Sequence, residues 1–297
     1  MHVSDTDSKP DAPSPGKPPA VGLVGLGNLG MPIALALLDA GWSVTVFDRR
    51  AELVERAGAQ GARAAADVSG LADQPMLAIA VTDDTAVDEV LIGSGLLSAL
   101  RAGSAVAVHS TILPVTAQRL GEQAVAAGIA LVDAPVSGGA ARARAGDLTV
   151  FAGGSPDALH RAKPYLDTVA STVVHLGGAG AGSAAKLGNQ LMMFASLAAT
   201  YEALDLAAVY DVAPEAFLRA VTHSTGDCWI AREWGFFDRT AAEYDASGLP
   251  LRYRPWSKDL WDLVATGRAH DLSLPVAGML AQLMPGWVEA HAHGSQP

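Results

Sequence analysis

The sequence predicts an α/β protein: a mostly parallel N-terminal sheet followed by an all-helical part, with a long helix joining the two. Three observations support this prediction. Short β-prone runs alternate with Ala- and Leu-rich stretches from Val21 onward, a glycine-rich turn follows the first run, and the alternation ends at the glycine cluster 177–180. Strands that alternate with helices in this rhythm are typical of βαβ units and a parallel sheet.

The expected elements follow from this rhythm. The expected strands are the short apolar runs Val21–Val24, Ser43–Phe47, Met76–Val81, Ser104–Val108, Ala130–Asp133, Thr149–Phe151 and Thr172–His175. Helices are expected at Met31–Ala40, Thr116–Ala127, Pro156–Val169, Ser183–Val209, Pro214–Thr222, Trp256–Thr266 and Leu274–Met284. A glycine cluster followed by a change of class indicates a boundary. We therefore expect a polar tail at 1–19, a dinucleotide-binding domain at 20–180 and a helical substrate and dimerisation domain at 181–297.

Composition excludes several classes of protein. Half of the 297 residues are hydrophobic, and 20 Lys and Arg against 31 Asp and Glu give a formal net charge of −11. An acidic surface repels nucleic-acid backbones and anionic membranes, so neither is an expected partner. Cys228 is the single cysteine, which excludes intrachain disulfides and fits a cytoplasmic location. No apolar run approaches the roughly 18 residues of a membrane span, and no metal site is expected.

The glycine turn Gly25-Leu26-Gly27-Asn28-Leu29-Gly30 follows a β-prone run and opens a helix. Gly25 would permit the tight turn, Gly27 would let the backbone approach a pyrophosphate, and Gly30 would let helix and strand pack closely. The pyrophosphate would meet free N–H groups at the positive end of the helix dipole. In this context the turn predicts a Rossmann-type dinucleotide site.

Residues after the next strands bear on the choice of cofactor. Asp48 ends the second strand, where a carboxylate accepts hydrogen bonds from the adenosine ribose hydroxyls and favours NAD. Arg49 and Arg50 follow it, and a guanidinium there could hold the 2′-phosphate of NADP, so NADP stays open. Thr82 and Asp83 follow the Met76–Val81 strand and are expected at the cofactor crevice, although an Asp there also caps a helix.

Three later segments complete the pattern: Asp133-Ala134-Pro135-Val136-Ser137-Gly138-Gly139, the stretch 180–190 around Lys186, and Lys258-Asp259-Leu260. With the glycine turn and Ser110-Thr111-Ile112, they resemble the β-hydroxyacid dehydrogenase family, which includes 3-hydroxyisobutyrate dehydrogenases and tartronate semialdehyde reductases. The resemblance runs from about Val21 to Leu283. Five motifs in family order are far more specific than any one of them.

The resemblance implies a role for each matching residue. Ser137, Gly138 and Gly139 would hold the substrate carboxylate, and Lys186 would be the catalytic acid and base. Asn189 would orient the substrate, with Gln190 beside it. Thr111 would lie near the nicotinamide and Lys258 would contact the cofactor. The resemblance also implies a homodimer formed through the helical domain.

Spacing alone supports part of this assignment. Lys186, Asn189 and Gln190 lie at i, i+3 and i+4 and therefore share one helix face. A lysine on an inward-looking face is desolvated, which lowers its pKa toward the range that proton transfer needs. Three other interpretations stay open: an interdomain salt bridge for Lys186, a helix-capping turn for Ser137-Gly138-Gly139, and a surface pair for Lys258-Asp259.

The predicted function is NAD(P)-dependent hydride transfer between nicotinamide and a small β-hydroxy acid or its semialdehyde. An imine reductase is one alternative, but those enzymes typically lack the lysine. A non-catalytic dinucleotide-binding scaffold is another, although it would need only the glycine turn. His109 is interpreted as a satisfied strand-end histidine, and His291 and His293 as solvated residues of a C-terminal tail. The aromatic cluster from Trp229 to Phe237 is interpreted as packing or a specificity surface.

Overall fold

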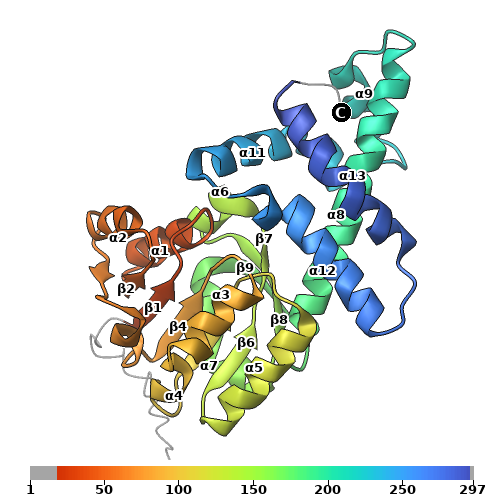
Figure 1. Cartoon of the computed structure of the whole chain (residues 1–297). Coiled ribbons are helices and arrows are strands. Elements are labelled where there is room, and N and C mark those ends of the chain that lie inside the picture. The colour runs from red at the N-terminus through yellow and green to blue at the C-terminus, as the bar shows by residue number, and fades with distance from the viewer. Residues whose placement is uncertain (1–18, 295–297) are drawn as a thin grey trace, which may run out of the picture.

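The computed structural model describes residues 19–294; the expected polar tail therefore lies almost entirely outside the described residues. Figure 1 shows a twisted sheet flanked by helices, with the second half of the chain forming a helical layer to one side of it. The strands are β1 (Ala20–Val24), β2 (Ser43–Phe47), β3 (Arg63–Ala64), β4 (Met76–Ile79), β5 (Ala105–Val108), β6 (Ala130–Asp133), β7 (Val136–Ser137), β8 (Leu148–Gly153) and β9 (Ala170–Gly177).

The sheet has the order β3-β2-β1-β4-β5-β6-β8-β7, and β9 pairs with β8. Strands β1 to β6 are all parallel, whereas β8 runs antiparallel to β6 and β7. The order reverses between β1 and β4, which is the point where ligands bind in doubly wound sheets. The prediction of a mostly parallel Rossmann-type sheet followed by helices is confirmed.

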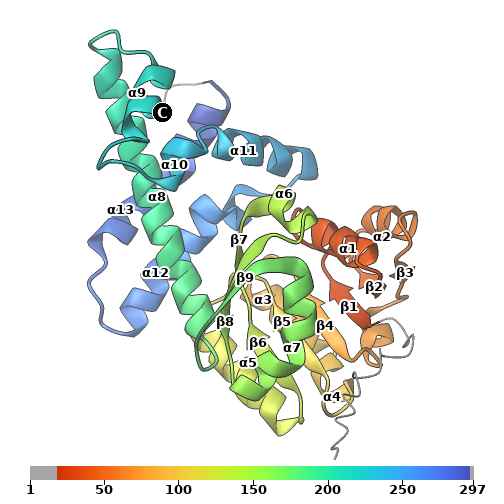
Figure 2. The same ribbon diagram turned by 180° about the vertical axis from the view of Figure 1, so that it is seen from behind.

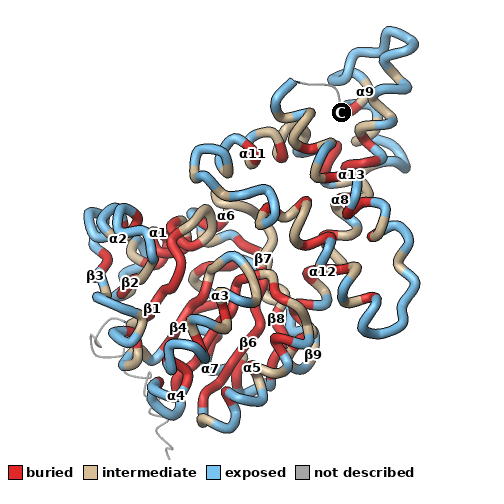
Figure 3. The backbone as a smooth tube through the Cα atoms, in the orientation of Figure 1, coloured by how far each residue is buried: buried red, intermediate tan, exposed pale blue. Residues whose placement is uncertain are grey.

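The helices of the first part cover both faces of the sheet (Figures 1 and 2). They are α1 (Gly30–Asp39), α2 (Ala51–Gly58), η1 (Val68–Leu71), α3 (Asp84–Asp88), η2 (Glu89–Gly93), α4 (Leu96–Ala99), α5 (Pro114–Ala126), α6 (Gly139–Arg144) and α7 (Pro156–Val169). Two apolar clusters, one on each face, bury the central strands completely (Figure 3). Such continuous burial explains why these strands are unbroken apolar runs in the sequence.

The helices of the second part form a separate apolar cluster around Trp256 and Phe194. They are α8 (Ala181–Ala208), α9 (Pro214–Val221), α10 (Trp229–Arg232), α11 (Phe236–Ser247), η3 (Leu251–Tyr253), α12 (Pro255–Ala269) and α13 (Pro275–Ala292). The sequence did not indicate α10 or α11, because they lie in the aromatic-rich stretch. It also missed β3 and β7, which have only two residues each and show no alternation.

The long helix α8 runs from the edge of the sheet along the helical part (Figure 1). By length and composition it could cross a membrane, although it has no unbroken apolar run of that length. The sequence analysis did not identify α8 as long and apolar enough to span a membrane, because isolated polar residues interrupt its apolar ones. One such helix is weak grounds for a membrane protein, since long helices of other proteins pass the same test. Its first half packs against β8, β9 and α12.

Candidate active site

The glycine turn lies between β1 and α1 and is shaped by close backbone contacts. A Cβ atom at Gly30 would lie 1.8 Å from the carbonyl oxygen of Gly25, and one at Gly25 would lie 2.3 Å from the carbonyl oxygen of Ala80. Gly25 also has a φ of +91°. At Gly27, by contrast, the nearest atom to an added Cβ is an Arg50 side-chain nitrogen at 3.8 Å. The turn is therefore tight at both ends and open in the middle, where a phosphate would approach.

Asn28 supplies a further sign that this turn holds a ligand. Its Nδ2 atom is buried and has no hydrogen-bond partner among the described residues. A buried donor without a partner costs free energy, so such atoms in native proteins usually meet a ligand or water. The first N–H groups of α1 also lack partners within the helix. These donors fit the pyrophosphate of a dinucleotide.

Asp48 directly follows β2 and holds the glycine turn in place. Its carboxylate accepts hydrogen bonds from the backbone N–H of Leu26 at 2.7 Å and from that of Arg50 at 2.9 Å. It also lines an open hollow of ≈ 420 Å³, whose other walls are Phe47, Arg49, Ala51, Val54, Glu55, Ala65 and Ala66. Sequence reasoning found Asp48 and Arg49 but missed the others, which lie at the end of β2, in α2 and after β3. The hollow lies where the adenosine half of a dinucleotide binds in such folds. Arg49 forms an ion pair with Glu89.

The loops after β4 and β5 are tied to each other. Asp83 caps α3 by accepting a hydrogen bond from the N–H of Ala86 at 2.8 Å, while Thr82 is exposed. The hydroxyl of Ser110 accepts from the N–H of Val81 at 3.0 Å. These bonds hold the two predicted cofactor loops together at the carboxyl edge of the sheet.

Lys258 reaches this edge from the helical part. Its Nζ atom donates to the carbonyl oxygen of Thr111 at 2.7 Å and lies 3.1 Å from a carboxylate oxygen of Asp259 and 2.7 Å from one of Asp262. The surface-pair interpretation of Lys258-Asp259 is therefore wrong, because Asp259 is buried and Lys258 nearly so. Sequence reasoning could not find this arrangement, because Lys258 and Thr111 are far apart along the chain.

Lys186 lies buried on α8, as its position on an inward face predicted. Burial lowers the pKa of its ammonium group to about 8, while the charge of Asp259 raises that pKa and the charge of Lys258 lowers it. Its Nζ atom donates to Oε1 of Gln190 at 2.9 Å, and Asn189 donates to the same oxygen at 3.2 Å. The structure thus brings the three predicted α8 residues together around an amine that titrates near neutral pH.

Asp133 fixes where α8 begins, a role that the sequence did not reveal. Its buried carboxylate accepts hydrogen bonds from the N–H groups of Gly180 at 2.9 Å and Ser183 at 2.8 Å. Burial raises the pKa of this carboxyl group, and the two N–H groups counteract that rise in part. A carboxylate at a helix N-terminus is favoured by the helix dipole. The end of β6 therefore positions the helix that carries Lys186.

Ser137, Gly138 and Gly139 lie at the junction of β7 and α6, shortly after Asp133. Both glycines have positive φ values, +139° and +72°. A Cβ atom at Gly139 would lie 3.3 Å from the ring of Phe236, so α11 covers this loop closely. The segment opens a short helix, as the capping interpretation expected. Glycine at both positions avoids the close contacts that a Cβ would make there with Arg142 and Phe236.

His109 is confirmed as a satisfied strand-end histidine. Its Nδ1 atom lies 2.7 Å from the carbonyl oxygen of Ala134 and its Nε2 atom lies 2.8 Å from the hydroxyl of Tyr165. Because a carbonyl only accepts, Nδ1 donates and Nε2 accepts from the tyrosine. Burial lowers the pKa of His109 to about 4. The ring is neutral at physiological pH and links the chain before Thr111 to the chain before Ser137.

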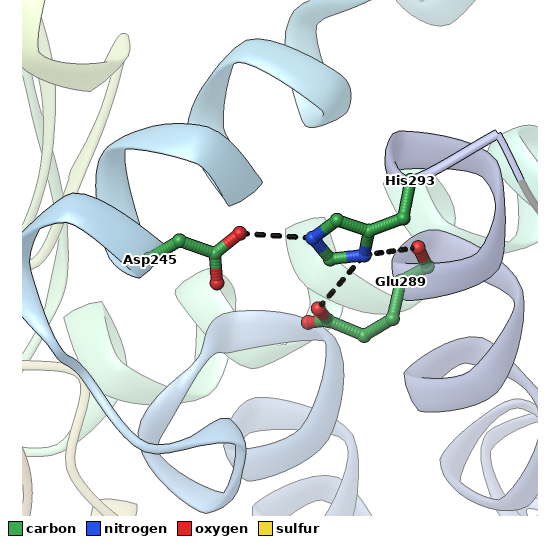
Figure 4. Close-up of side chains that lie close together, drawn as sticks. All are labelled: Asp245, Glu289 and His293. Atoms are coloured by element: carbon green, nitrogen blue, oxygen red, sulfur yellow. Dashed lines mark hydrogen bonds and ion pairs between the residues drawn. The ribbon is translucent and has the colours of Figure 1, made fainter.

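A second polar cluster lies away from these loops, where Asp245, Glu289 and His293 gather at the C-terminal end of the described chain (Figure 4). His293 contacts Asp245 at 2.9 Å and accompanies His291, which contacts Asp238 at 2.7 Å. Both histidines are exposed, as expected, but the expectation of a tail is wrong, because His291 lies in the last turn of α13 and His293 caps that helix.

This cluster could be taken for a metal site, since its ligand-type atoms lie within 4.8 Å of one another. However, the buried guanidinium of Arg254 donates to both oxygens of Glu289 at 3.0 Å and to Asp245 at 2.6 Å. A guanidinium already supplies the positive charge that a metal ion would bring, and the two would repel each other. We interpret the cluster as an ion-pair network joining α11, α12 and α13.

Comparisons with known proteins agree with this geometry. The family "NAD binding domain of 6-phosphogluconate dehydrogenase" matches residues 20–177, and the family "NAD-binding of NADP-dependent 3-hydroxyisobutyrate dehydrogenase" matches residues 180–296. An uncharacterized oxidoreductase of Mycobacterium tuberculosis is 38% identical over 89% of this chain and 91% of its own length. The 3-hydroxyisobutyrate dehydrogenase of Pseudomonas aeruginosa is 33% identical, with 92% and 93% covered.

A solved structure gives the same result. The 3-hydroxyisobutyrate dehydrogenase of Mycobacterium tuberculosis, determined with L-serine, superposes with a TM-score of 0.79. It is 26% identical, and the match covers 93% of this chain and 96% of that one.

Proposed function

The chain belongs to the β-hydroxyacid dehydrogenase family of NAD(P)-dependent oxidoreductases, and from this premise we propose that it interconverts a short β-hydroxy acid and its semialdehyde. The observation that carries the proposal is Lys186, a buried amine with a pKa of about 8 beside Asn189. A scaffold would need only the glycine turn. An imine reductase typically has another residue at this lysine, so neither alternative is favoured.

The proposed mechanism assigns each step to the residues present. The glycine turn with Asn28 would hold the pyrophosphate of a bound NAD(P), whose nicotinamide would supply the hydride chemistry of the reaction in both directions. During oxidation the neutral amine of Lys186 takes the hydroxyl proton of the substrate, and during reduction its ammonium returns that proton. Ser137, Gly138 and Gly139 bind the substrate carboxylate, and Asn189 orients its hydroxyl. Lys258 contacts the cofactor and holds the Thr111 loop beside it.

A substrate panel tests this proposal. Reduced-nicotinamide absorbance should change with at least one of 3-hydroxyisobutyrate, L-serine and L-threonate, which are the substrates or ligand of relatives. Oxidation should accelerate as pH rises through about 8, because only the neutral Lys186 accepts a proton. Reduction should have the opposite dependence, since it needs the ammonium. Absence of turnover in both directions, with every acid and its semialdehyde, would refute the proposed reaction.

We also propose that the enzyme prefers NAD to NADP. Asp48 lines the hollow after β2 with its carboxylate, which would accept from ribose hydroxyls and repel a 2′-phosphate. The same panel, assayed with each cofactor, compares the two values of kcat/KM. A higher value with NADP would contradict the preference and would point to Arg49 or Arg50 instead.

We propose that the enzyme is a homodimer formed through α8. Beyond Lys186, this helix and the turn that follows it leave a row of large apolar side chains in solvent: Met192 and Leu206 on α8, and Val209 and Tyr210 just after it, are each at least 66% exposed. Exposed apolar rows of this kind mark association surfaces in soluble proteins. From the composition we further propose a cytoplasmic location, with neither nucleic acid nor a membrane as partner.

A charge placed in this row tests the dimer. Leu206→Asp should weaken dimerisation at least about tenfold, because an unpaired buried carboxylate opposes association. Val125→Asp on α5 is the matched control, since Val125 is 77% exposed against 66% for Leu206 but lies on the sheet domain. Sedimentation equilibrium measures both. A monomeric wild-type protein, or a Leu206→Asp variant as dimeric as the wild type, would contradict the proposal.

A further inference from the structure

A buried line of polar side chains connects α8 to α12 beneath the proposed proton-transfer site. Lys186 donates to Oε1 of Gln190 at 2.9 Å, and Nε2 of Gln190 donates to Oδ2 of Asp259 at 2.7 Å. The three residues are 8%, 3% and 3% exposed, respectively. Gln190 was expected to bind substrate, yet both ends of its amide are engaged by protein groups.

The charge of Asp259 fixes the direction of this amide. A carboxylate only accepts hydrogen bonds, so the NH₂ group of Gln190 must face Asp259. Its oxygen must then face Lys186 and the side-chain nitrogen of Asn189, which are both donors. If the amide were reversed, its oxygen would face the Asp259 carboxylate, which is also an acceptor. Its NH₂ group would face Lys186 and Asn189, which are also donors. Gln190 therefore has a single orientation that satisfies every group.

This orientation has two consequences for Lys186. One N–H of the amine is committed to Gln190, which limits the lone pair of the neutral amine to the two remaining positions on Nζ. The amide also stands between Lys186 and Asp259 as an uncharged spacer. A carboxylate in direct contact would hold the ammonium form strongly and remove the base from the neutral pH range.

We propose that Gln190 is a positioning residue for proton transfer, which orients the Lys186 amine and keeps the Asp259 carboxylate from pairing with it directly. The role of Gln190 in turnover rests on the proposed function. The hydrogen-bonded link from Lys186 through Gln190 to Asp259 does not depend on that function.

The other charged groups on the elements near Lys186 come from α12, the start of α3 and the end of β6. Lys258 lies 3.1 Å from the second oxygen of Asp259 and lowers the pKa of Lys186 by its charge. Asp262 binds Lys258 in turn, and Asp84 lies close enough to raise the pKa of Asp262. Asp133 faces the start of α8 and is bound by its N–H groups. Of these groups, only Asp259 is linked to Lys186 through one intervening side chain, that of Gln190.

Gln190→Met removes both hydrogen bonds while keeping the length of the side chain. The pKa of Lys186 should fall further below its ordinary value, because the hydrogen bond from its ammonium group to Gln190 is lost. The limiting kcat for oxidation should fall about tenfold through loss of orientation, with KM nearly unchanged. The pH profile of kcat should therefore have a lower plateau, and its midpoint should move to a lower pH. Gln282→Met, at an exposed glutamine of α13, is the matched control and should change neither quantity.

The pKa of Lys186 can be measured without substrate. The chain has five lysines, Lys9, Lys17, Lys163, Lys186 and Lys258. Their ¹³Cε signals in lysine-labelled protein can be titrated by NMR, with Lys186→Met assigning the signal. Asp259→Asn serves as a second variant with unchanged side-chain shape. It should also lower the pKa of Lys186, because the charge that favours the ammonium is removed.

The outcomes separate the two proposals. A lowered Lys186 pKa in both variants supports the link even if no tested acid is turned over, in which case only the proposed reaction fails. A Lys186 pKa at the wild-type value in both variants would overturn the link. A rise in KM with unchanged kcat in Gln190→Met would show that Gln190 binds substrate and would also overturn it.

Discussion

Lys186→Met should lower kcat by a factor of about 10²–10⁴ in both directions, because positioned acid-base groups contribute about that much to proton transfer. Methionine keeps the length and apolar stem of lysine but has no proton to exchange. Cofactor affinity should stay within about twofold of the wild type, since Lys186 faces Gln190 and not the glycine turn. Steady-state kinetics and titration with reduced nicotinamide cofactor measure the two quantities.

The stability of this variant separates a chemical role from a structural one. The folded pKa of Lys186 lies near 8, below its ordinary value of 10.5, so the unfolded chain binds a proton that the folded chain lacks between these values. The stability of the wild type should therefore rise with pH across this window. Lys186→Met should lose that rise and should be at least as stable at pH 7. Lys163→Met, at an exposed lysine of α7, is the control for the substitution itself. Full activity in Lys186→Met would rule out the acid-base assignment.

Gly30→Ala should abolish tight cofactor binding and also destabilise the protein. The added Cβ would lie 1.8 Å from the backbone oxygen of Gly25, so the turn or the start of α1 must move. Strain from overpacking of this kind typically costs about 1–3 kcal/mol of unfolding free energy. The displaced turn would no longer present its N–H groups to the pyrophosphate, and we expect the cofactor Kd to rise at least about 100-fold.

Gly58→Ala provides the comparison. Gly58 lies at the end of α2, and a Cβ there would meet nothing within 4 Å. Alanine in a helix is about 0.5–1 kcal/mol more favourable than glycine, so this variant should be neutral or slightly stabilised. Chemical denaturation and fluorescence titration compare the pair. Cofactor binding in Gly30→Ala equal to that in Gly58→Ala would show that the turn does not hold the pyrophosphate.

The parts of the site that local spacing determines could be predicted from the sequence. The glycine turn is one such part, because a strand, a turn and a helix start follow one another within a few residues. The shared face of Lys186, Asn189 and Gln190 is another, because helical periodicity fixes it. The mostly parallel order followed from alternating elements in the same way.

The missing parts depend on contacts between distant residues. Asp133 binds Gly180 across 47 positions, and Gln190 binds Asp259 across 69. No spacing rule connects such pairs, so Asp259 resembled an ordinary surface residue and the anchoring role of Asp133 went unnoticed. For the same reason His293 could not be matched with Asp245. The short strands β3 and β7 were missed because the tertiary fold, and not their own sequence, makes them strands.

The bond between Asp133 and the start of α8 has a consequence for how the enzyme could move. The loop at Ser137, proposed to bind the substrate carboxylate, and Lys186, proposed as the base, both follow from the end of a single strand, β6, through the chain after Asp133 and through its bond to the start of α8. The distance from the proposed carboxylate site at Ser137 to Lys186 is therefore set by β6 and the chain bound to its end. It does not depend on how the outer helices pack against the sheet. If α11 rocks relative to the sheet, it would change how easily substrate enters and leaves. The distance between the proposed carboxylate site and Lys186 would be preserved through such a movement, while α12 stays bound to α8 through Gln190 and Asp259.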